Sequence, residues 1–172
     1  MRKQKGFSLI ELLIVVAIIL IIAAIAIPNL LRARMAANES SAASGIRTIN
    51  TAEITYQSTY PTVGFSNTLL ALGGPIAAVC TPASATACLI DGVMANNGNP
   101  AGSGKSGYSY NVVGGAQAGG VYVQYGANAT PLTINQTGIR AFCAVEDAVV
   151  RYDSNGACST VHNTILTFPP LG

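Results

Sequence analysis

Near its start the chain reads Lys5-Gly6-Phe7-Ser8-Leu9-Ile10-Glu11, followed by sixteen consecutive apolar residues from Leu12 to Ile27. A helix from Phe7 to Leu31, rising ~1.5 Å per residue, would extend roughly 37 Å, enough to cross a hydrocarbon core of ~30 Å. A carboxylate at Glu11 costs a few kcal/mol in such a setting. Because a plain anchor needs no carboxylate there, Glu11 is a candidate functional residue.

A secretory signal peptide is the simplest alternative for this segment. Its apolar region usually holds only ~7–15 residues and ends in a small-x-small cleavage site. The apolar run here is longer, and no such site follows it cleanly. The sequence therefore favours a segment that stays in the mature protein.

The segment Gly6-Phe7-Ser8-Leu9-Ile10-Glu11, after a short basic leader, resembles the class III signal of type IV pilins and type II secretion pseudopilins. In that family a prepilin peptidase cuts after the glycine, and the new N-terminal phenylalanine is N-methylated. The resemblance implies cleavage between Gly6 and Phe7, methylation of Phe7, and an assembly role for Glu11. It covers about the first thirty residues and places Pro28 where the family often has a helix-kinking proline.

Charge is scarce and unevenly placed. Charged residues make up 9% of the chain, against ~25% in ordinary soluble domains. The net charge is +2, but Arg2, Lys3 and Lys5 lie in the leader, so the mature side chains sum to six positive minus seven negative, or −1. This excludes a basic face for nucleic acid. Since basic residues stay cytoplasmic, the bulk of the protein is predicted outside the cytoplasm.

Four cysteines indicate an exported chain in an oxidising compartment. Three pairings are possible, and local spacing favours Cys80–Cys88 and Cys143–Cys158. A zinc site is the rival interpretation, but the chain has no Cys-x-x-Cys and its single histidine is His162. We therefore expect two disulfides and neither metal nor cofactor.

The pattern predicts one helix from Phe7 to Tyr60, ended by Pro61. Pro28 removes a backbone donor, which predicts a kink or local melting near residues 24–28. Glu53 interrupts the apolar stripe of the second half, and Gly45 weakens the helix by up to ~1 kcal/mol relative to alanine. The stripe recurs at mostly three-, four- or seven-residue steps and should pack on a globular domain; its members are Leu31, Met35, Ala42, Ile46, Ile49, Tyr56 and Tyr60.

The chain after the helix changes composition twice. Residues 61–107 are rich in small and polar residues and predict a long connection, with a helical turn at Leu69–Leu72. Residues 108–172 show strand periodicity and a tail bounded by a disulfide. We expect a first hairpin of Tyr108–Val113 with Val121–Tyr125. A second, tighter hairpin is expected for Ile139–Val145 with Ala148–Tyr152, around Glu146-Asp147. A last short strand is expected at Thr164–Phe168.

These elements predict an α+β fold, a long N-terminal helix packed on a four-stranded antiparallel sheet. Its parts are a leader (1–6), a membrane and assembly half-helix (7–31), an amphipathic half-helix (32–60), a connecting region (61–107) and a sheet region (108–172). This is the arrangement that a type IV pilin would have.

No enzyme signature survives inspection. The stretch Gly102-Ser-Gly-Lys105-Ser106 ends like a phosphate-binding loop. That motif needs a glycine at position 99, where this chain has Asn, and a following helix, where a strand is expected. We therefore predict a plain loop. His162 lies in a polar tail without an obvious carboxylate partner, which favours a surface residue over a Ser-His-Asp set. Asp153-Ser-Asn-Gly156 lacks the later Glu of a calcium loop and predicts a turn.

The sequence therefore predicts a structural subunit of a type IV pilus-like filament rather than an enzyme. Its expected partners are further copies of itself, the bacterial inner membrane that holds the precursor, the prepilin peptidase and the pilus assembly machinery. Its expected final location is a cell-surface filament. Two alternatives stay open: a pseudopilin of a type II secretion system, and a low-copy tip subunit acting in adhesion or DNA binding.

Overall fold

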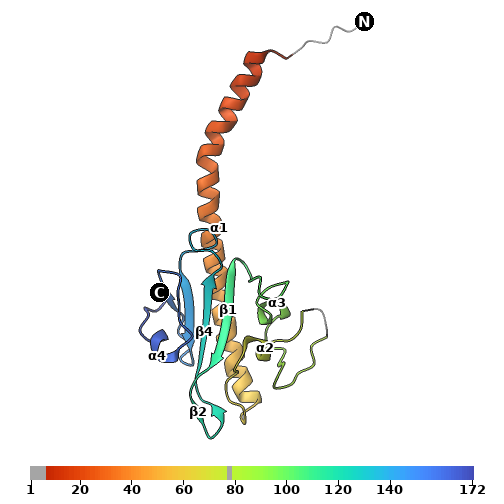
Figure 1. Cartoon of the computed structure of the whole chain (residues 1–172), viewed down its shortest axis with the longest axis vertical. Helices are drawn as coiled ribbons and strands as arrows, with labels where there is room; N and C mark the ends of the chain where they lie inside the picture. The colour runs from red at the N-terminus through yellow and green to blue at the C-terminus, as the bar shows by residue number, and fades with distance from the viewer. Residues whose placement is uncertain (1–6, 77–78) are drawn as a thin grey trace. The chain divides into compact units, whose positions relative to one another are not determined.

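The computed structural model describes residues 7–76 and 79–172, so Gly6 and the bond that follows it lie outside the described residues. The chain forms two compact units, Met1–Arg34 and Met35–Gly172. A single helix, α1 (Leu9–Thr59), contributes residues to both (Figure 1).

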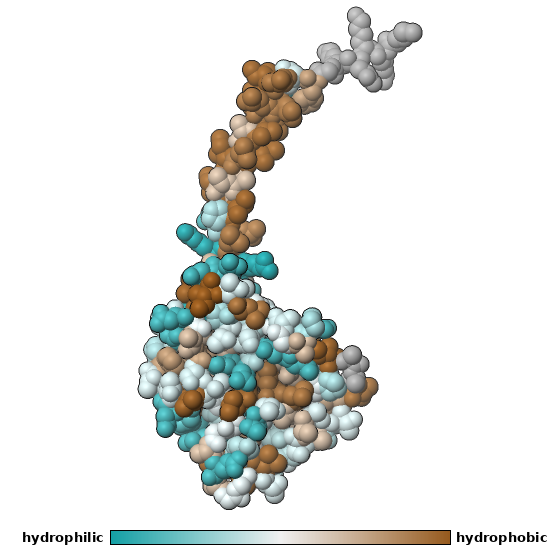
Figure 2. All heavy atoms as spheres, in the orientation of Figure 1, coloured by the Kyte–Doolittle hydropathy of each residue, from teal (hydrophilic) through white to brown (hydrophobic). Residues whose placement is uncertain are grey.

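The first unit is the start of α1, and its surface is almost entirely apolar. On the face that Figure 2 shows, hydrophobic side chains form a nearly continuous run along this stretch. The helix continues through Pro28 without a break. Local melting near residues 24–28 was therefore a wrong expectation, because the neighbouring apolar residues keep the helical backbone; a kink there stays a prediction.

The second unit contains a four-stranded antiparallel sheet in the order β1-β4-β5-β6 (Figure 1). With α1 this confirms the predicted α+β fold. Three short helices and a separate two-stranded ribbon, β2 with β3, complete the described part of the unit. The strands and short helices are α2 (Leu69–Leu72), α3 (Gly92–Ala95), β1 (Tyr108–Gly114), β2 (Gln117–Ala118), β3 (Val121–Tyr122), β4 (Tyr125–Pro131), β5 (Ala141–Val145), β6 (Arg151–Asp153) and α4 (His162–Ile165).

The predicted first hairpin is wrong in its second strand. β1 pairs with β4, from Tyr108 opposite Pro131 to Gly114 opposite Tyr125, whereas the predicted strand at 121–125 supplies only the short β3 and the first residue of β4. The sequence of β4 is poor in β-branched residues. Ala127 and Ala129 are nevertheless fully buried, so packing against neighbouring elements outweighs their low strand propensity.

The second hairpin has a longer turn than predicted, and the last strand does not exist. Cys143 faces Arg151 across β5 and β6, which leaves residues 146–150 as the connection. Ala148 donates to the carbonyl of Val145, and Ala148 itself has a positive φ of 58°. The predicted strand at 164–168 does not form, because α4 runs to Ile165 and the chain then turns, with the Phe168 N–H donating to the Ile165 carbonyl. Ile165 is fully buried, and α4 contacts the central strands β4 and β5.

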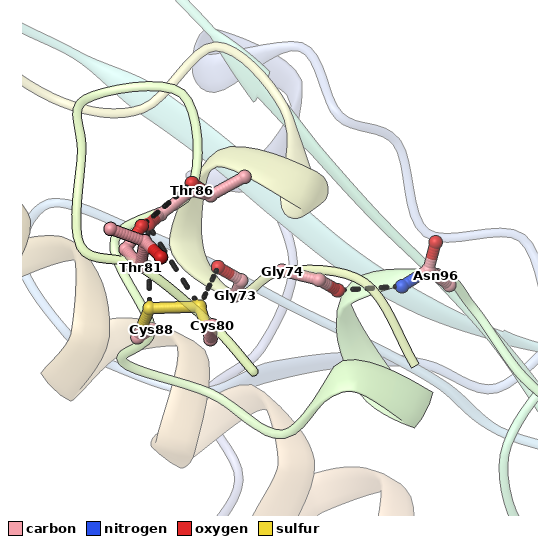
Figure 3. Close-up of a disulfide and its surroundings, with 7 residues drawn as sticks. All are labelled: Gly73, Gly74, Cys80, Thr81, Thr86, Cys88 and Asn96. Atoms are coloured by element: carbon pink, nitrogen blue, oxygen red, sulfur yellow. Dashed lines mark hydrogen bonds between the residues drawn. A yellow bond between two sulfur atoms is a disulfide. The ribbon is translucent and has the colours of Figure 1, made fainter. Parts of the chain in front are cut away.

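Both cysteine pairs chosen from local spacing are joined in the structure. Figure 3 shows Cys80–Cys88 beside the end of α2. The backbone N–H groups of Ala87 and Leu89 donate to carbonyls of α2 over 2.7 Å, so the clipped loop is fixed to that helix. The second bridge, Cys143–Cys158, ties the tail to β5, and both of its cysteines are buried.

The buried face of α1 forms the core with the sheet. Its members include Ala42, Ile46, Ile49 and Tyr56 of the predicted stripe, whereas Leu31 is exposed. Gly45 lies on this face despite its low helix propensity, because a side chain would not fit there. A Cβ at Gly45 would stand 2.7 Å from the ring of Tyr110 on β1.

We therefore expect Gly45→Ala to destabilise the protein. Alanine gains up to ~1 kcal/mol of helix propensity, but forcing a buried ring aside costs typically ~1–3 kcal/mol. Thermal unfolding of the mature chain in detergent measures the balance, with exposed Ser44→Ala on the same helix as the control. A rise in Tm for Gly45→Ala beyond that of Ser44→Ala would contradict the close contact with Tyr110.

Candidate functional site

The apolar part of α1 is the first component of the site. Its large side chains are exposed throughout, from Phe7 to Leu31. Within residues 7–76 and 79–172, α1 is the one helix long and apolar enough to cross a membrane. Because burying each such side chain is worth ~1.5–3 kcal/mol, this surface requires a partner, either lipid or other protein.

Glu11 lies in the first turn of α1 and has a local partner. Its Oε2 accepts a hydrogen bond of 2.9 Å from the backbone N–H of Ser8. Ser and Glu three residues apart form the pattern of a capping box, in which the carboxylate satisfies an otherwise free donor at the helix start. A negative charge there also complements the helix dipole.

The structure therefore brings Ser8 and Glu11 together beside Phe7, which precedes the helix and is exposed. Gly6 lies outside the described residues, and Pro28 lies more than four turns further along α1. The capping role of Glu11 was missed by the sequence analysis, although the Ser-x-x-Glu spacing could have revealed it.

Two buried carboxylates hold the second half of α1 against its unit. Glu39 accepts from the backbone N–H of Ile139 at 2.9 Å and of Arg140 at 3.1 Å, and from Arg140 Nε at 2.8 Å. Burial alone raises the pKa of Glu39, but these donors and the guanidinium charge outweigh it, so the pKa lies below its ordinary value. Glu39 is thus an ionised link between α1 and the start of β5.

Glu53 is the second carboxylate, and its setting is the reverse. The prediction that Glu53 interrupts the packed face is wrong, because the residue lies fully buried within that face. It accepts from the backbone N–H of Ser66 at 2.9 Å and from the Ser66 hydroxyl. Burial raises the pKa of Glu53 to about 7, and the Ser66 hydrogen bonds only partly oppose it.

The stability of the protein should therefore depend on pH through Glu53. Between its ordinary pKa of 4.5 and about 7, the folded chain holds a proton that the unfolded chain has lost, so stability falls as pH rises. The full effect is on the order of 3 kcal/mol. Urea unfolding of wild type and Glu53→Gln at pH 5 and pH 8 measures it.

We expect Glu53→Gln to lose this dependence, whereas Asp153→Asn, which removes a half-buried carboxylate at the end of β6, should keep it. A wild type that is more stable at pH 8 than at pH 5, relative to Glu53→Gln, would contradict the buried neutral carboxyl.

Lys105 and His162, the two residues considered as candidates for enzymatic chemistry, each contact a carboxylate. Lys105, at the end of the phosphate-loop-like stretch, forms a 2.7 Å ion pair with Asp91 at the start of α3. His162 is not the isolated surface residue that was predicted, since its Nε2 lies 2.6 Å from Glu146 Oε1 and its side chain is largely buried. Among the described residues, the acidic, cysteine and histidine side chains form no cluster able to hold a metal.

The N-terminal residues match a known sequence motif. Residues 1–27 match the family model described as the prokaryotic N-terminal methylation motif. The chain therefore carries a prepilin-type N-terminus, as the resemblance implied.

Two curated relatives extend this likeness. The type IV wide pilus major component PilA4 of Thermus thermophilus is 68% identical over 40 residues, which cover 23% of this chain and 30% of that protein. The type IV major pilin protein PilA of Myxococcus xanthus is 47% identical over 51 residues, covering 30% and 23% respectively. The chain is homologous to these type IV pilins over that stretch, which is less than a third of either relative. No solved structure matches the chain.

Proposed function

We propose that the protein is the structural subunit of a type IV pilus-like filament. The observation that supports this best is the combination of a prepilin motif with a helix that exposes apolar side chains on all sides. A one-sided apolar stripe would suit docking on a single partner. A helix that is apolar all round must be surrounded, as it is by lipid or within a bundle of like helices.

The proposed life of the chain has two stages. A precursor is held in the bacterial inner membrane by residues 7–31, with the basic leader in the cytoplasm and the second unit outside. A prepilin peptidase then cuts between Gly6 and Phe7, Phe7 is N-methylated, and the assembly machinery transfers the helix from lipid into the filament core. The filament reaches the cell surface.

In this proposal Glu11 sets the axial offset between neighbouring subunits. Apolar burial is non-directional, so it holds helices together without selecting their axial offset. Cleavage creates a positive amine on Phe7, and a neighbouring subunit's Glu11 can pair with it only at one offset. In a low-dielectric core an unpaired charge is strongly destabilising. On this proposal Glu11 exchanges its own Ser8 N–H for a neighbour's amine, or serves both at once through its two oxygens.

Cleavage is tested at the residue before the proposed scissile bond. Gly6 leaves no side chain there, so we expect Gly6→Ala to be tolerated and the branched Gly6→Val to block processing. N-terminal sequencing of membrane protein from cells making each variant gives the readout. Recovery of Phe7 as the N-terminus of the Gly6→Val protein would overturn the site.

The pairing of Glu11 is tested by filament yield. We expect Glu11→Leu to insert and to be cleaved normally but to assemble poorly, because it leaves the neighbour's amine buried without a partner at a cost of several kcal/mol. Glu11→Gln keeps an acceptor oxygen and should be intermediate. The measurement is the ratio of sheared filaments to mature subunit in the membrane.

Ser8→Ala is the matched control for this test, because it removes a polar side chain at the helix start while the carboxylate and the backbone N–H that it accepts from both stay. Its yield should stay near that of wild type. A Glu11→Leu variant with wild-type yield would remove the pairing, and a Ser8→Ala variant as defective as Glu11→Leu would assign the defect to disturbance of the helix start instead of loss of the carboxylate.

The other candidate functions lack a specific observation in their favour. Both relatives are named as major pilus proteins, which supports a main filament subunit over a pseudopilin or a low-copy tip subunit. The single catalytic candidate, His162, is bonded to Glu146 and Asn163. A structural role, without enzymatic activity, accounts for all of these features.

A further inference from the structure

The second unit has an exposed apolar surface that takes no part in its core. It is formed by residues 132–139, here named the β4–β5 loop, which together with Arg140 connect β4 to β5. Its three large apolar side chains are 46%, 49% and 43% exposed at Leu132, Ile134 and Ile139. Between Lys105 and Arg140 the chain has no charged residue, so the loop presents apolar groups among Thr, Asn and Gln only.

The loop is firmly built. Thr137 donates from its backbone N–H to the carbonyl of Thr133 at 2.9 Å, and its hydroxyl accepts from the Thr133 N–H at 3.1 Å. Asn135 donates to the carbonyl of Gly138 at 2.9 Å. The side chain of Ile134 and the carbonyl of Ile139 both lie against Gly156, where an added Cβ would stand 3.2 Å from the Ile134 side chain and 3.0 Å from that carbonyl. These backbone groups of the loop are thus paired, while its large apolar side chains stay about half exposed.

Two residues of α1 hold this loop at the end of the unit where the helix enters. Asn38 Nδ2 donates to the Thr137 carbonyl at 2.8 Å, and Glu39 accepts from the Ile139 N–H at 2.9 Å. Figure 1 shows β4 directed toward this part of the second unit. The loop is therefore anchored within the first five residues of the unit.

Chain length then limits how far the loop can be from the membrane. Asn38 lies only seven positions after Leu31, which is the last large exposed apolar residue at the start of α1. Because this stretch is helical, it covers roughly 10 Å. The headgroup layer adds several ångströms beyond the hydrocarbon core on each side, so the anchoring residue lies at or just above it.

We infer that the β4–β5 loop is a membrane-contact surface of the unassembled subunit, with Leu132, Ile134 and Ile139 in the headgroup layer on the outer side. This inference rests on the proposed membrane-held precursor and deepens it. Apolar side chains set among uncharged polar ones suit that layer, where apolar groups leave water without entering hydrocarbon. Leaving the membrane during assembly then requires the loop to detach as well as the helix.

The absence of tryptophan from the chain makes the inference directly testable. Three single reporters are introduced into the full chain: Ile134→Trp in the loop, Leu166→Trp as a control, and Ile22→Trp in the anchor. Leu166 is 46% exposed and apolar. It follows α4, which packs at the opposite end of β4, where Thr160 lies against Gly126. Leu132→Trp serves as a second loop reporter if Ile134→Trp fails to fold.

Each protein is reconstituted into phosphatidylethanolamine–phosphatidylglycerol vesicles, with acyl chains unlabelled, brominated near the headgroup, or brominated near the chain end. We expect the loop reporter to be quenched by the shallow bromine and blue-shifted relative to Leu166→Trp, and the anchor reporter to be quenched by the deep bromine. Equal quenching of the loop and control reporters, with Ile22→Trp quenched, would overturn the inference alone.

The remaining outcomes also decide the matter. An unquenched Ile22→Trp would overturn the membrane anchor itself and the loop contact with it. A loop reporter that is unquenched in vesicles but blue-shifted in sheared filaments would assign the surface to a second copy of the chain and overturn the lipid contact.

Discussion

The apolar surface of residues 12–31 governs everything else about this protein. Sixteen consecutive apolar residues and the exposed positions around them represent tens of kcal/mol of unfavourable hydration if left in water. This surface therefore needs an apolar partner. On the function proposed above, the chain passes from one apolar environment, the bilayer, to another, a bundle of like helices.

Because apolar burial has no preferred direction, the fold relies on a few polar side chains wherever position matters. In the second unit three polar residues of the buried α1 face each hold one connecting loop. Glu39 binds the start of β5, Asn50 donates to the Ala148 carbonyl and accepts from the Tyr125 hydroxyl, and Glu53 holds Ser66. Slipping α1 along the sheet would leave all three unpaired, at ~1–3 kcal/mol or more each. Glu11 plays the corresponding part in the proposed contact between subunits.

The sequence predicted the features that depend on local pattern. The long apolar run, the end of the helix near Pro61, the change to strand periodicity and the α+β class could all be predicted without coordinates. What it could not reveal was set by contacts between distant residues. β4 is built from Gly, Ala and Asn that have poor strand propensity, and only its fit against the core makes it a central strand. Glu53 was predicted to interrupt the apolar stripe because its partner, Ser66, lies beyond the end of the helix.

The candidate site divides in the same way. Glu11 stood out because a carboxylate in an apolar run needs a reason, and its spacing from Ser8 is a recognisable capping pattern. His162 was misjudged because Glu146 reaches it only through the turn after β5. Gly45 illustrates the reverse error, in which a residue that weakens the helix is required by the ring of Tyr110.

The central claim is that residues 7–31 leave lipid to be surrounded by the same segment of other copies. Cryo-imaging of filaments sheared from cells that make this chain tests it most directly. The account predicts a filament whose core is formed by residues 7–31 of successive copies, with Glu11 of one copy beside the Phe7 amine of another. Filaments made of another protein, with this chain found only in the membrane, would contradict it.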